Sequence, residues 1–213
     1  MATVLIVGAS KGIGLATVQA ALKAGHSVRA LARSATAIRV AHPKLEKVDG
    51  DARDQDTIEQ ALAGMEVVIQ TLGVIPAPSL IVFGTQLFSR ATRVLVGAME
   101  AGPVKRLICV TGFGAGDSRG YGGLLYNAAL SLFLSQVYAD KDVQERIIRR
   151  SRLDWTIVRP TILTDGPRTG NYRVLVDPRD WTSGFISRAD MADFLVKQID
   201  DKSLLRRMPT LTD

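Results

Sequence analysis

Short apolar runs alternate along the chain with longer segments in which apolar residues recur every three or four positions. The short runs predict strands at 3–7, 27–31, 46–49, 66–71, 105–111 and 154–159, and the longer segments predict helices at 13–24, 54–63, 84–101, 123–151 and 188–200. Several strands are apolar on both faces, as expected when helices cover both sides of a parallel sheet. The pattern predicts the α/β fold class, with a doubly wound parallel sheet.

The alternation weakens after about residue 160, where glycine and proline interrupt short strand-like pieces such as YRVLV. No linker, repeat or low-complexity stretch divides the sequence, so residues 1–213 are expected to form one domain. Ligands of doubly wound sheets bind at the carboxyl ends of the strands. We therefore expect residues 160–186 to form a small irregular segment that caps this edge and contacts the substrate.

The stretch VLIVGASKGIG at 4–14 places three glycines between a predicted strand and a predicted helix. Glycine permits positive φ and a close backbone approach, and the free N–H groups at the start of the helix attract an anion. The turn predicts a site for a dinucleotide diphosphate, with an unliganded glycine-rich turn as the alternative. The residues that we assign to this site are Gly8, Ser10, Lys11, Gly12, Ile13 and Gly14.

The end of the second predicted strand bears on which dinucleotide binds. NAD sites commonly carry an acidic residue there for the ribose 2′-hydroxyl, whereas this chain has Arg33 followed by Ser34. A guanidinium suits a 2′-phosphate, and Lys11 can reach the same group, so we predict NADP(H) as the cofactor. Two solvated surface cations are the alternative. The residues that we expect beside the adenosine half are Asp51, Ala52, Leu72 and Gly73.

Composition narrows the classes of partner. The formal net charge is +6, but the basic residues are dispersed, so we expect no nucleic-acid partner. No apolar run reaches the length of a membrane helix, about 20 residues, and the amino terminus leads directly into a strand, so a cytoplasmic protein is expected.

The single cysteine, Cys109, excludes an internal disulfide and is expected to be buried. His26 and His42 have no neighbouring ligands, so no metal site is expected.

Together these residues resemble the atypical short-chain dehydrogenases/reductases, in particular the NAD(P)H-binding group that includes flavin/biliverdin-IXβ-type reductases and NmrA-like proteins. The segments that carry the resemblance are GASKGIG at 8–14, ALARS at 30–34, GDARD at 50–54, VTGFGAGDSRG at 110–120, YADKDVQE at 138–145, SRLDWTIVRPTILTDGP at 151–167 and FISRADMADFLV at 185–196. The resemblance implies a Rossmann-type domain, NADP(H) binding and hydride transfer to or from a small organic substrate such as a flavin, a quinone or a carbonyl compound.

The resemblance also implies catalytic positions. The main branch of the family uses Tyr-x-x-x-Lys on a helix, with a Ser or Thr at the end of the fifth strand, which Thr111 matches. Here Tyr138 and Lys141 are three residues apart, so they can share a helix face but the hydroxyl is displaced. We expect Lys141 to contact the nicotinamide ribose and Tyr138 to line the substrate side. The alternatives are a packing role for Tyr138 and a surface pair between Lys141 and Glu145.

Two further segments are expected on the nicotinamide side. Pro160, Thr161 and Ile162 follow the sixth strand and should pass beside the ring. Residues 112–123 contain six glycines in twelve residues, which suggests a mobile lid or a passive flexible loop.

The displaced tyrosine keeps three functions open. A reductase is the leading hypothesis, and a catalytically silent NADP(H) sensor of the NmrA type is the second. Chemistry on a nucleotide sugar is disfavoured, because such enzymes usually carry a larger substrate domain. The broad apolar faces of the helices at 84–101 and 123–151 suit either a monomer or a homodimer.

Overall fold

A computed structural model describes residues 1–74, 84–129, 132 and 134–213 of the chain. Its main sheet has eight strands in the order β3-β2-β1-β4-β5-β6-β10-β8. The first six in chain order are β1 (Thr3–Val7), β2 (Ser27–Ala32), β3 (Leu45–Asp49), β4 (Val67–Gln70), β5 (Arg106–Val110) and β6 (Asp154–Pro160). All of them pair in parallel, so their carboxyl ends share one edge of the sheet. The fold is a Rossmann-type α/β domain, as the sequence predicts.

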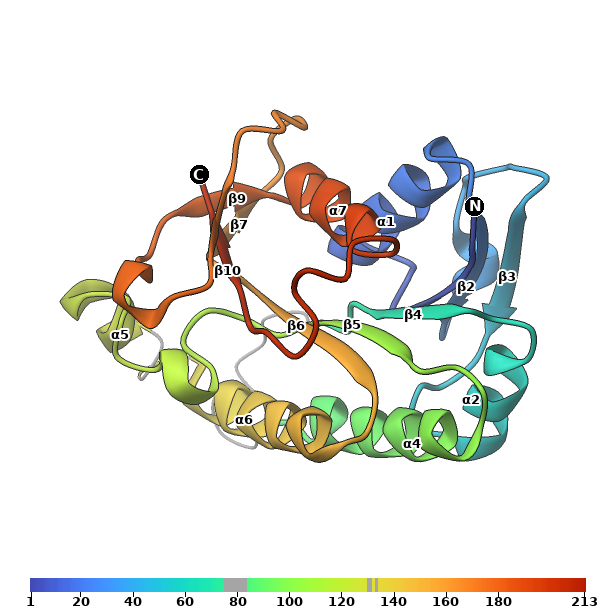
Figure 1. The fold of residues 1–213 in the computed structure, drawn as a ribbon, viewed down its shortest axis with the longest axis horizontal. Helices are drawn as coiled ribbons and strands as arrows, with labels where there is room; N and C mark the ends of the chain where they lie inside the picture. The colour runs from blue at the N-terminus through green and yellow to red at the C-terminus, as the bar shows by residue number, and fades with distance from the viewer. Residues whose placement is uncertain (75–83, 130–131, 133) are drawn as a thin grey trace.

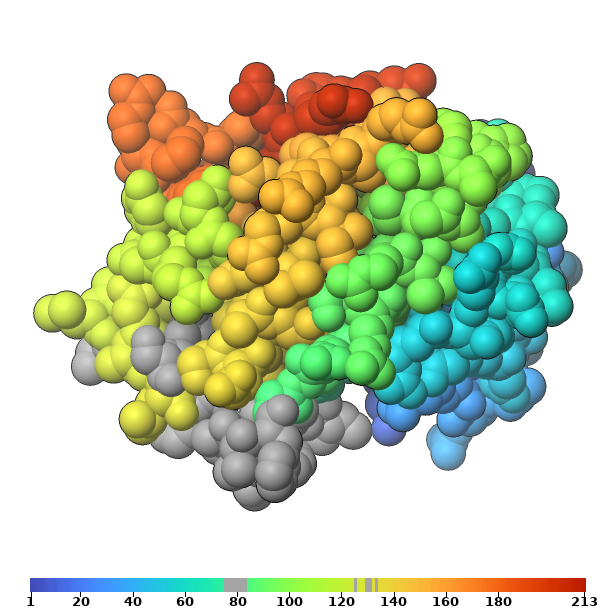
Figure 2. All heavy atoms as spheres, turned by 90° about the horizontal axis from the view of Figure 1, so that it is seen from below, coloured from blue at the N-terminus to red at the C-terminus, as the bar shows by residue number. Residues whose placement is uncertain are grey.

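Helices cover both faces of the sheet (Figure 1). One face carries α1 (Gly12–Lys23) and α7 (Arg188–Lys197), and the opposite face carries α2 (Gln55–Leu62), α4 (Leu87–Ala101) and α6 (Ser135–Arg150). Figure 2 shows α4 and α6 lying side by side across the second face. The short helix α5 (Leu124–Ala129) lies apart from these layers, at one end of the molecule.

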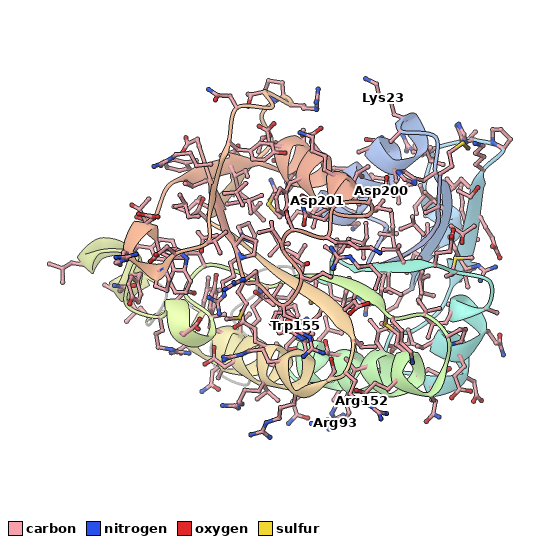
Figure 3. All side chains as sticks on the ribbon, in the orientation of Figure 1. Lys23, Arg93, Arg152, Trp155, Asp200 and Asp201 are labelled. Carbon is pink, nitrogen blue, oxygen red and sulfur yellow. The ribbon has the colours of Figure 1, made fainter. Side chains whose placement is uncertain are left out.

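Each face of the sheet has its own apolar core. Val18 of α1 and Phe194 of α7 pack on the first face, and Leu95 of α4 and Ile148 of α6 pack on the second. Trp155 of β6 belongs to the second core and lies between the sheet and the α4/α6 layer (Figure 3). Burial of each such side chain contributes about 1.5–3 kcal/mol, so these two cores hold the layers together.

Cys109 of β5 is fully buried in the second core, as expected. Its Sγ lies 3.2 Å from Gln70 Oε1 and 3.2 Å from Gln144 Nε2. Burial raises the pKa of the Cys109 thiol well above its usual range. The thiol is therefore a packing group among buried amides.

The region after residue 160 contains more regular structure than the sequence indicates. β7 (Ile162–Thr164) and β9 (Phe185–Ser187) form a parallel two-stranded sheet, and β8 (Arg173–Leu175) pairs in antiparallel fashion with β10 (Thr210–Thr212). β10 also pairs in parallel with β6 and so extends the main sheet. These strands are three residues long, too short for an alternating pattern to reveal them.

The helix predicted at 123–151 corresponds to α5 and α6, and residues 130, 131 and 133 between them lie outside the described part of the chain. Three 3₁₀ turns complete the described elements: η1 (Ala35–Ala37), η2 (Gly116–Ser118) and η4 (Pro178–Asp180). The predicted strands and the remaining predicted helices are confirmed, with small shifts at their ends.

The connection from β1 to α1 depends on a close backbone approach. A Cβ on Gly14, inside α1, would lie 2.1 Å from the carbonyl oxygen of Gly8. Gly8 has φ of 89°, and a Cβ there would lie 2.9 Å from the carbonyl oxygen of Thr71. The helix thus packs directly against the turn and the adjacent end of β4.

We expect Gly14→Ala to lower the free energy of unfolding by about 1–3 kcal/mol or more, because the added methyl group meets a fixed backbone oxygen. Gly97 is a matched control, because it lies inside α4 and no described residue comes within 4 Å of a Cβ there. Gly97→Ala should raise the free energy of unfolding by about 0.5–1 kcal/mol. Urea unfolding measures the free energy of unfolding of both variants, provided that their m-values equal that of the wild type. Equal unfolding midpoints for Gly14→Ala and the wild type would show that the close approach of Gly14 to Gly8 does not limit stability.

Candidate functional site

The turn between β1 and α1 has the shape of an anion cradle. Gly8 and Gly12 both have positive φ, of 89° and 55°. Lys11 occupies the N-cap of α1 without a side-chain cap, and the first turn of the helix carries no acidic residue. The backbone N–H groups of the first turn therefore remain available, and Lys11 and Gly12 are exposed beside them. Ser10 and Ile13 are half-buried in the same turn. These residues fit a dinucleotide diphosphate.

Arg33 and Ser34 are exposed at the end of β2. Within the described part of the chain, Arg33 forms no salt bridge. It lies close enough to Asp51 for its positive charge to help lower the pKa of that carboxyl group. Its guanidinium is therefore available for an anion at the end of the strand.

Asp51 follows β3 and is engaged by a neighbour. Arg53 Nη2 lies 2.6 Å from Asp51 Oδ2, and this hydrogen bond lowers the pKa of Asp51 to about 2. A surface hollow of about 450 Å³ adjoins the pair, and its lining residues are Asp51, Arg53, Asp54, Arg90, Arg93 and Val94. Ala52 is buried, Leu72 is half-buried and Gly73 is exposed, and no described residue lies within 4 Å of a Cβ on Gly73. A hollow thus lies between the loop before α2 and α4, and Asp51 is the residue of the predicted adenosine side that lines it.

Tyr138 and Lys141 of α6 converge on Gly112, two residues after the end of β5. A Cβ on Gly112 would lie 2.9 Å from the Tyr138 hydroxyl and 3.3 Å from Lys141 Nζ. Lys141 Nζ donates to the carbonyl oxygen of Thr111 and lies 5.0 Å from the centre of the Phe88 ring. The three-residue spacing therefore does bring a hydroxyl and an ammonium group together at the carboxyl edge of the sheet.

The two groups respond to burial in opposite directions. Burial lowers the pKa of Lys141 to about 8, because the charged ammonium loses its water. Burial raises the pKa of the Tyr138 hydroxyl above its usual range. Burial therefore favours the neutral form of both groups.

Thr111 faces the interior and joins a buried ionic network. Its hydroxyl donates to Glu145 Oε1 at 2.8 Å. Arg159 holds the same carboxylate through Nε at 3.0 Å and Nη2 at 2.6 Å, and Nη2 also lies 2.6 Å from Asp117 Oδ1. Glu145 is thus paired with Arg159, and the surface pair between Lys141 and Glu145 weighed from the sequence does not form.

The network and a second tyrosine were not found by sequence reasoning. The Tyr126 hydroxyl of α5 donates to the carbonyl oxygen of Phe113 at 2.9 Å, and it lies close enough to Tyr138 to raise the pKa of that hydroxyl. Arg159 is fully buried, although its sequence DWTIVRP suggests only a strand end. Its signal was an arginine within an otherwise apolar strand, where a charge needs a partner.

Pro160, Thr161 and Ile162 lie at the end of β6 and the start of β7. Pro160 is buried, and the Thr161 hydroxyl donates to the carbonyl oxygen of Leu211 at 3.1 Å. Ile162 is 43% exposed beside Phe185, its register partner in β9, which is 53% exposed. Only Ile162 of the three presents a side chain at the surface, where it forms an apolar ledge with Phe185.

The glycine-rich segment 112–123 is well packed over its first half. Phe113 and Ser118 are fully buried, and the Gly116 N–H donates to Asp142 Oδ1 at 2.6 Å. Arg119 and Asp117 add ion pairs to α6 and β6. Residues 112–118 of the predicted lid or flexible loop are therefore packed, because neighbouring side chains supply the partners that glycine lacks.

The described residues lack both a metal-binding cluster and a membrane-spanning helix. They contain no group of three or more His, Cys, Asp or Glu side chains placed to hold a metal ion. None of their helices has both the length and the apolar character needed to cross a membrane.

Comparison with other proteins places these features in a family. A Bacillus subtilis protein described as an uncharacterized sugar epimerase, YhfK, is 32% identical over 124 residues, which are 58% of this chain and 51% of that protein. Eugenol synthase 2 of Clarkia breweri is 25% identical over 225 residues, 96% of this chain and 67% of the relative. The chain thus spans about half of the first relative and two thirds of the second.

Solved structures resemble the whole chain. ChuY of Escherichia coli O157:H7, described as an anaerobilin reductase, is 26% identical, with a TM-score of 0.79 over 99% of this chain and 96% of ChuY. A short-chain dehydrogenase/reductase of Veillonella parvula in complex with NADP shares the fold, with a TM-score of 0.84, 17% identity and coverage of 100% and 94%. The predicted resemblance to the NAD(P)H-binding group is confirmed by a family match. Residues 8–202 match the NAD(P)H-binding family, and the chain belongs to that family.

Proposed function

We propose that this protein is an NADPH-dependent reductase that transfers hydride to a small organic acceptor such as a flavin, a quinone or a carbonyl compound. The observation that carries the proposal is the meeting of Tyr138 and Lys141 over Gly112. This point lies on the same edge of the sheet as the glycine turn after β1. ChuY, which is described as a reductase, supports oxidoreductase chemistry.

The preference for NADPH over NADH rests on Arg33. No acidic residue stands at the end of β2, and Asp51 is already held by Arg53. Arg33 would bind the 2′-phosphate with Lys11 beside it, because guanidinium and phosphate match in charge and geometry. The cofactor would extend from there across the turn, with Asp51, Ala52, Leu72 and Gly73 along its adenosine half.

Bound NADPH would supply the hydride, and the chain would supply the proton and the positioning. We assign delivery of the proton to Lys141, since its pKa of about 8 lets it give up a proton near neutral pH. The same ammonium would hold the nicotinamide ribose, and Tyr138 would line the acceptor side. Thr111 is assigned a positioning role, because its hydroxyl is bound to Glu145 while its carbonyl oxygen orients Lys141.

Turnover distinguishes this proposal from an NADP(H) sensor. NADPH absorbance would be followed while flavin, quinone and aldehyde acceptors are added to the protein. We expect oxidation with at least one class of acceptor. Tight NADPH binding without oxidation across the panel would favour the sensor, and failure to bind NADPH or NADH would overturn both.

We expect Arg33→Ala to weaken NADPH binding by about ten- to hundredfold, the cost of a lost hydrogen bond to a charged group. NADH binding should stay the same, since NADH lacks the 2′-phosphate. Arg152→Ala is the matched control, because this arginine is 86% exposed beyond the end of α6 (Figure 3). Fluorescence titration of each variant with both nucleotides provides the measurement, and an equal loss for NADPH and NADH would exclude a 2′-phosphate contact.

The assignment of Lys141 predicts a pH dependence. With a carbonyl acceptor, kcat/KM should fall as the pH rises through about 8, because Lys141 loses the proton that it delivers. Lys141→Met should reduce this activity while NADPH still binds. A profile that stays level through this pH would contradict the role.

The same lysine should affect stability. Its pKa in the folded state, about 8, lies below its ordinary value of 10.5, so the unfolded chain binds more protons between these values. The free energy of unfolding should therefore gain a rising contribution as the pH increases through this window. Lys141→Met should remove that contribution, whereas Lys23→Met, at the exposed end of α1, should retain it (Figure 3).

A further inference from the structure

α7 begins beside the glycine turn and places an arginine over it. Arg188 is the first residue of α7, and its Nε lies 3.7 Å from the position that a Cβ on Gly12 would take. Its Cδ lies 4.0 Å from the same point. α1 and α7 pack against each other on one face of the sheet (Figure 1), and their amino-terminal ends meet at Gly12 and Arg188.

The stability of α7 does not explain this arginine. A cation in the first turn of a helix opposes the helix dipole. Ser187 and Asp190 already cap α7, since the Asp190 N–H donates to Ser187 Oγ at 2.9 Å. Arg188 therefore acts against the local electrostatics of its own helix, and its side chain lies instead over the first turn of α1.

The partner of Arg188 is readily exchanged. Arg188 Nη1 lies 2.6 Å from Asp165 Oδ1, and the Asp165 side chain is 88% exposed. The Arg188 side chain itself is 32% exposed. An ion pair with one partner in solvent contributes little, because water screens it and holding it in place costs side-chain entropy. A phosphate is a stronger partner, because it carries more charge and accepts two parallel hydrogen bonds from a guanidinium.

We propose that Arg188 binds the diphosphate of the cofactor, exchanging Asp165 for a phosphate oxygen when the dinucleotide occupies the turn. This inference rests on the proposed position of NADPH at the glycine turn. It adds to that site a cation from the opposite end of the sequence, distinct from Lys11 and Arg33. The diphosphate would then lie between the N–H groups of α1 and the guanidinium at the start of α7.

Nucleotide fragments test this contact without any turnover. ADP-ribose has the diphosphate but no 2′-phosphate, and adenosine 2′-monophosphate has the 2′-phosphate but no diphosphate. We expect Arg188→Met to weaken ADP-ribose, NADPH and NADH binding by about tenfold each, and to leave adenosine 2′-monophosphate binding unchanged. Arg33→Ala should show the opposite pattern for the two fragments. Calorimetric titration measures all four ligands.

Three further variants test whether the loss of affinity in Arg188→Met comes from the lost phosphate contact or from a disturbed structure. Arg168→Met is the matched control, because Arg168 Nε lies 2.7 Å from Oδ1 of Asp193, which belongs to α7 as Arg188 does. It should leave ADP-ribose binding unchanged. Arg188→Lys should restore part of the affinity. Asp165→Asn breaks the Arg188 pair but keeps the guanidinium, so it should not lose affinity.

The outcomes separate the two proposals. Unchanged ADP-ribose binding in a folded Arg188→Met protein would overturn the contact while leaving the reductase in place. An equal loss of affinity in Asp165→Asn would also overturn it, since the ion pair itself would then be what matters. If the wild-type protein bound neither ADP-ribose nor NADPH, the proposed function and this inference would both fail.

Discussion

The buried pair between Arg159 and Glu145 is the constraint on which the candidate site depends. Arg159 is fully buried, and the Glu145 side chain is 2% exposed. Two charges in this environment are tolerated only when each is well paired, because removal from water is costly. The pair joins β6 to α6, and it also binds the end of β5 through Thr111 and the turn η2 through Asp117. The centre of the Trp181 ring lies 5.2 Å from the guanidinium carbon of Arg159. The segment after β8 therefore also packs against this ion pair.

This pair also sets the position of the groups that meet over Gly112. Tyr138, Lys141 and Glu145 are spaced by three and four residues on α6, so they form one stripe of the helix. The hydrogen bonds from Arg159 to Glu145 turn this stripe of α6 toward the end of β6. Tyr138 and Lys141 are then directed to the carboxyl edge of the sheet. The geometry of the site is thus a consequence of a charge pair that itself lies out of contact with solvent.

The sequence predicts the parts of the fold that depend on local patterns. The strands β1 and β4 to β6 are apolar on both faces, and α1 follows a glycine turn, so each carries its own signal. β7, β9 and β10 owe their existence to pairing with strands distant in the sequence, which no local pattern records. A single helix over 123–151 would have placed Tyr126 and Tyr138 about 18 Å apart along its axis, at 1.5 Å per residue. In the structure the two hydroxyls lie close enough to influence each other's pKa, which requires α5 and α6 to be separate helices.

The candidate site likewise contains residues that local motifs reveal and residues that only the structure reveals. The glycine turn, Arg33, and the pair Tyr138 and Lys141 could be named from motifs, because the residues are close together in the sequence. The partners of Thr111 and Arg159 could not be named, since Glu145 and Asp117 come from other elements. Arg188 lies within the segment FISRADMADFLV, and nothing in that local sequence indicates what its side chain contacts. Only the packing of α7 on α1 shows what its side chain approaches.

The burial of Cys109 has a practical consequence for spectroscopic work on this protein. The thiol is fully buried and holds its proton, so alkylating and dye reagents that attack thiolates at neutral pH have no accessible target in the native fold. It is also the only cysteine of the chain. The natural sequence is therefore ready for single-site labelling: one cysteine introduced on the surface, for instance beside the ledge of Ile162 and Phe185, would carry a fluorophore or spin label without any prior removal of native thiols.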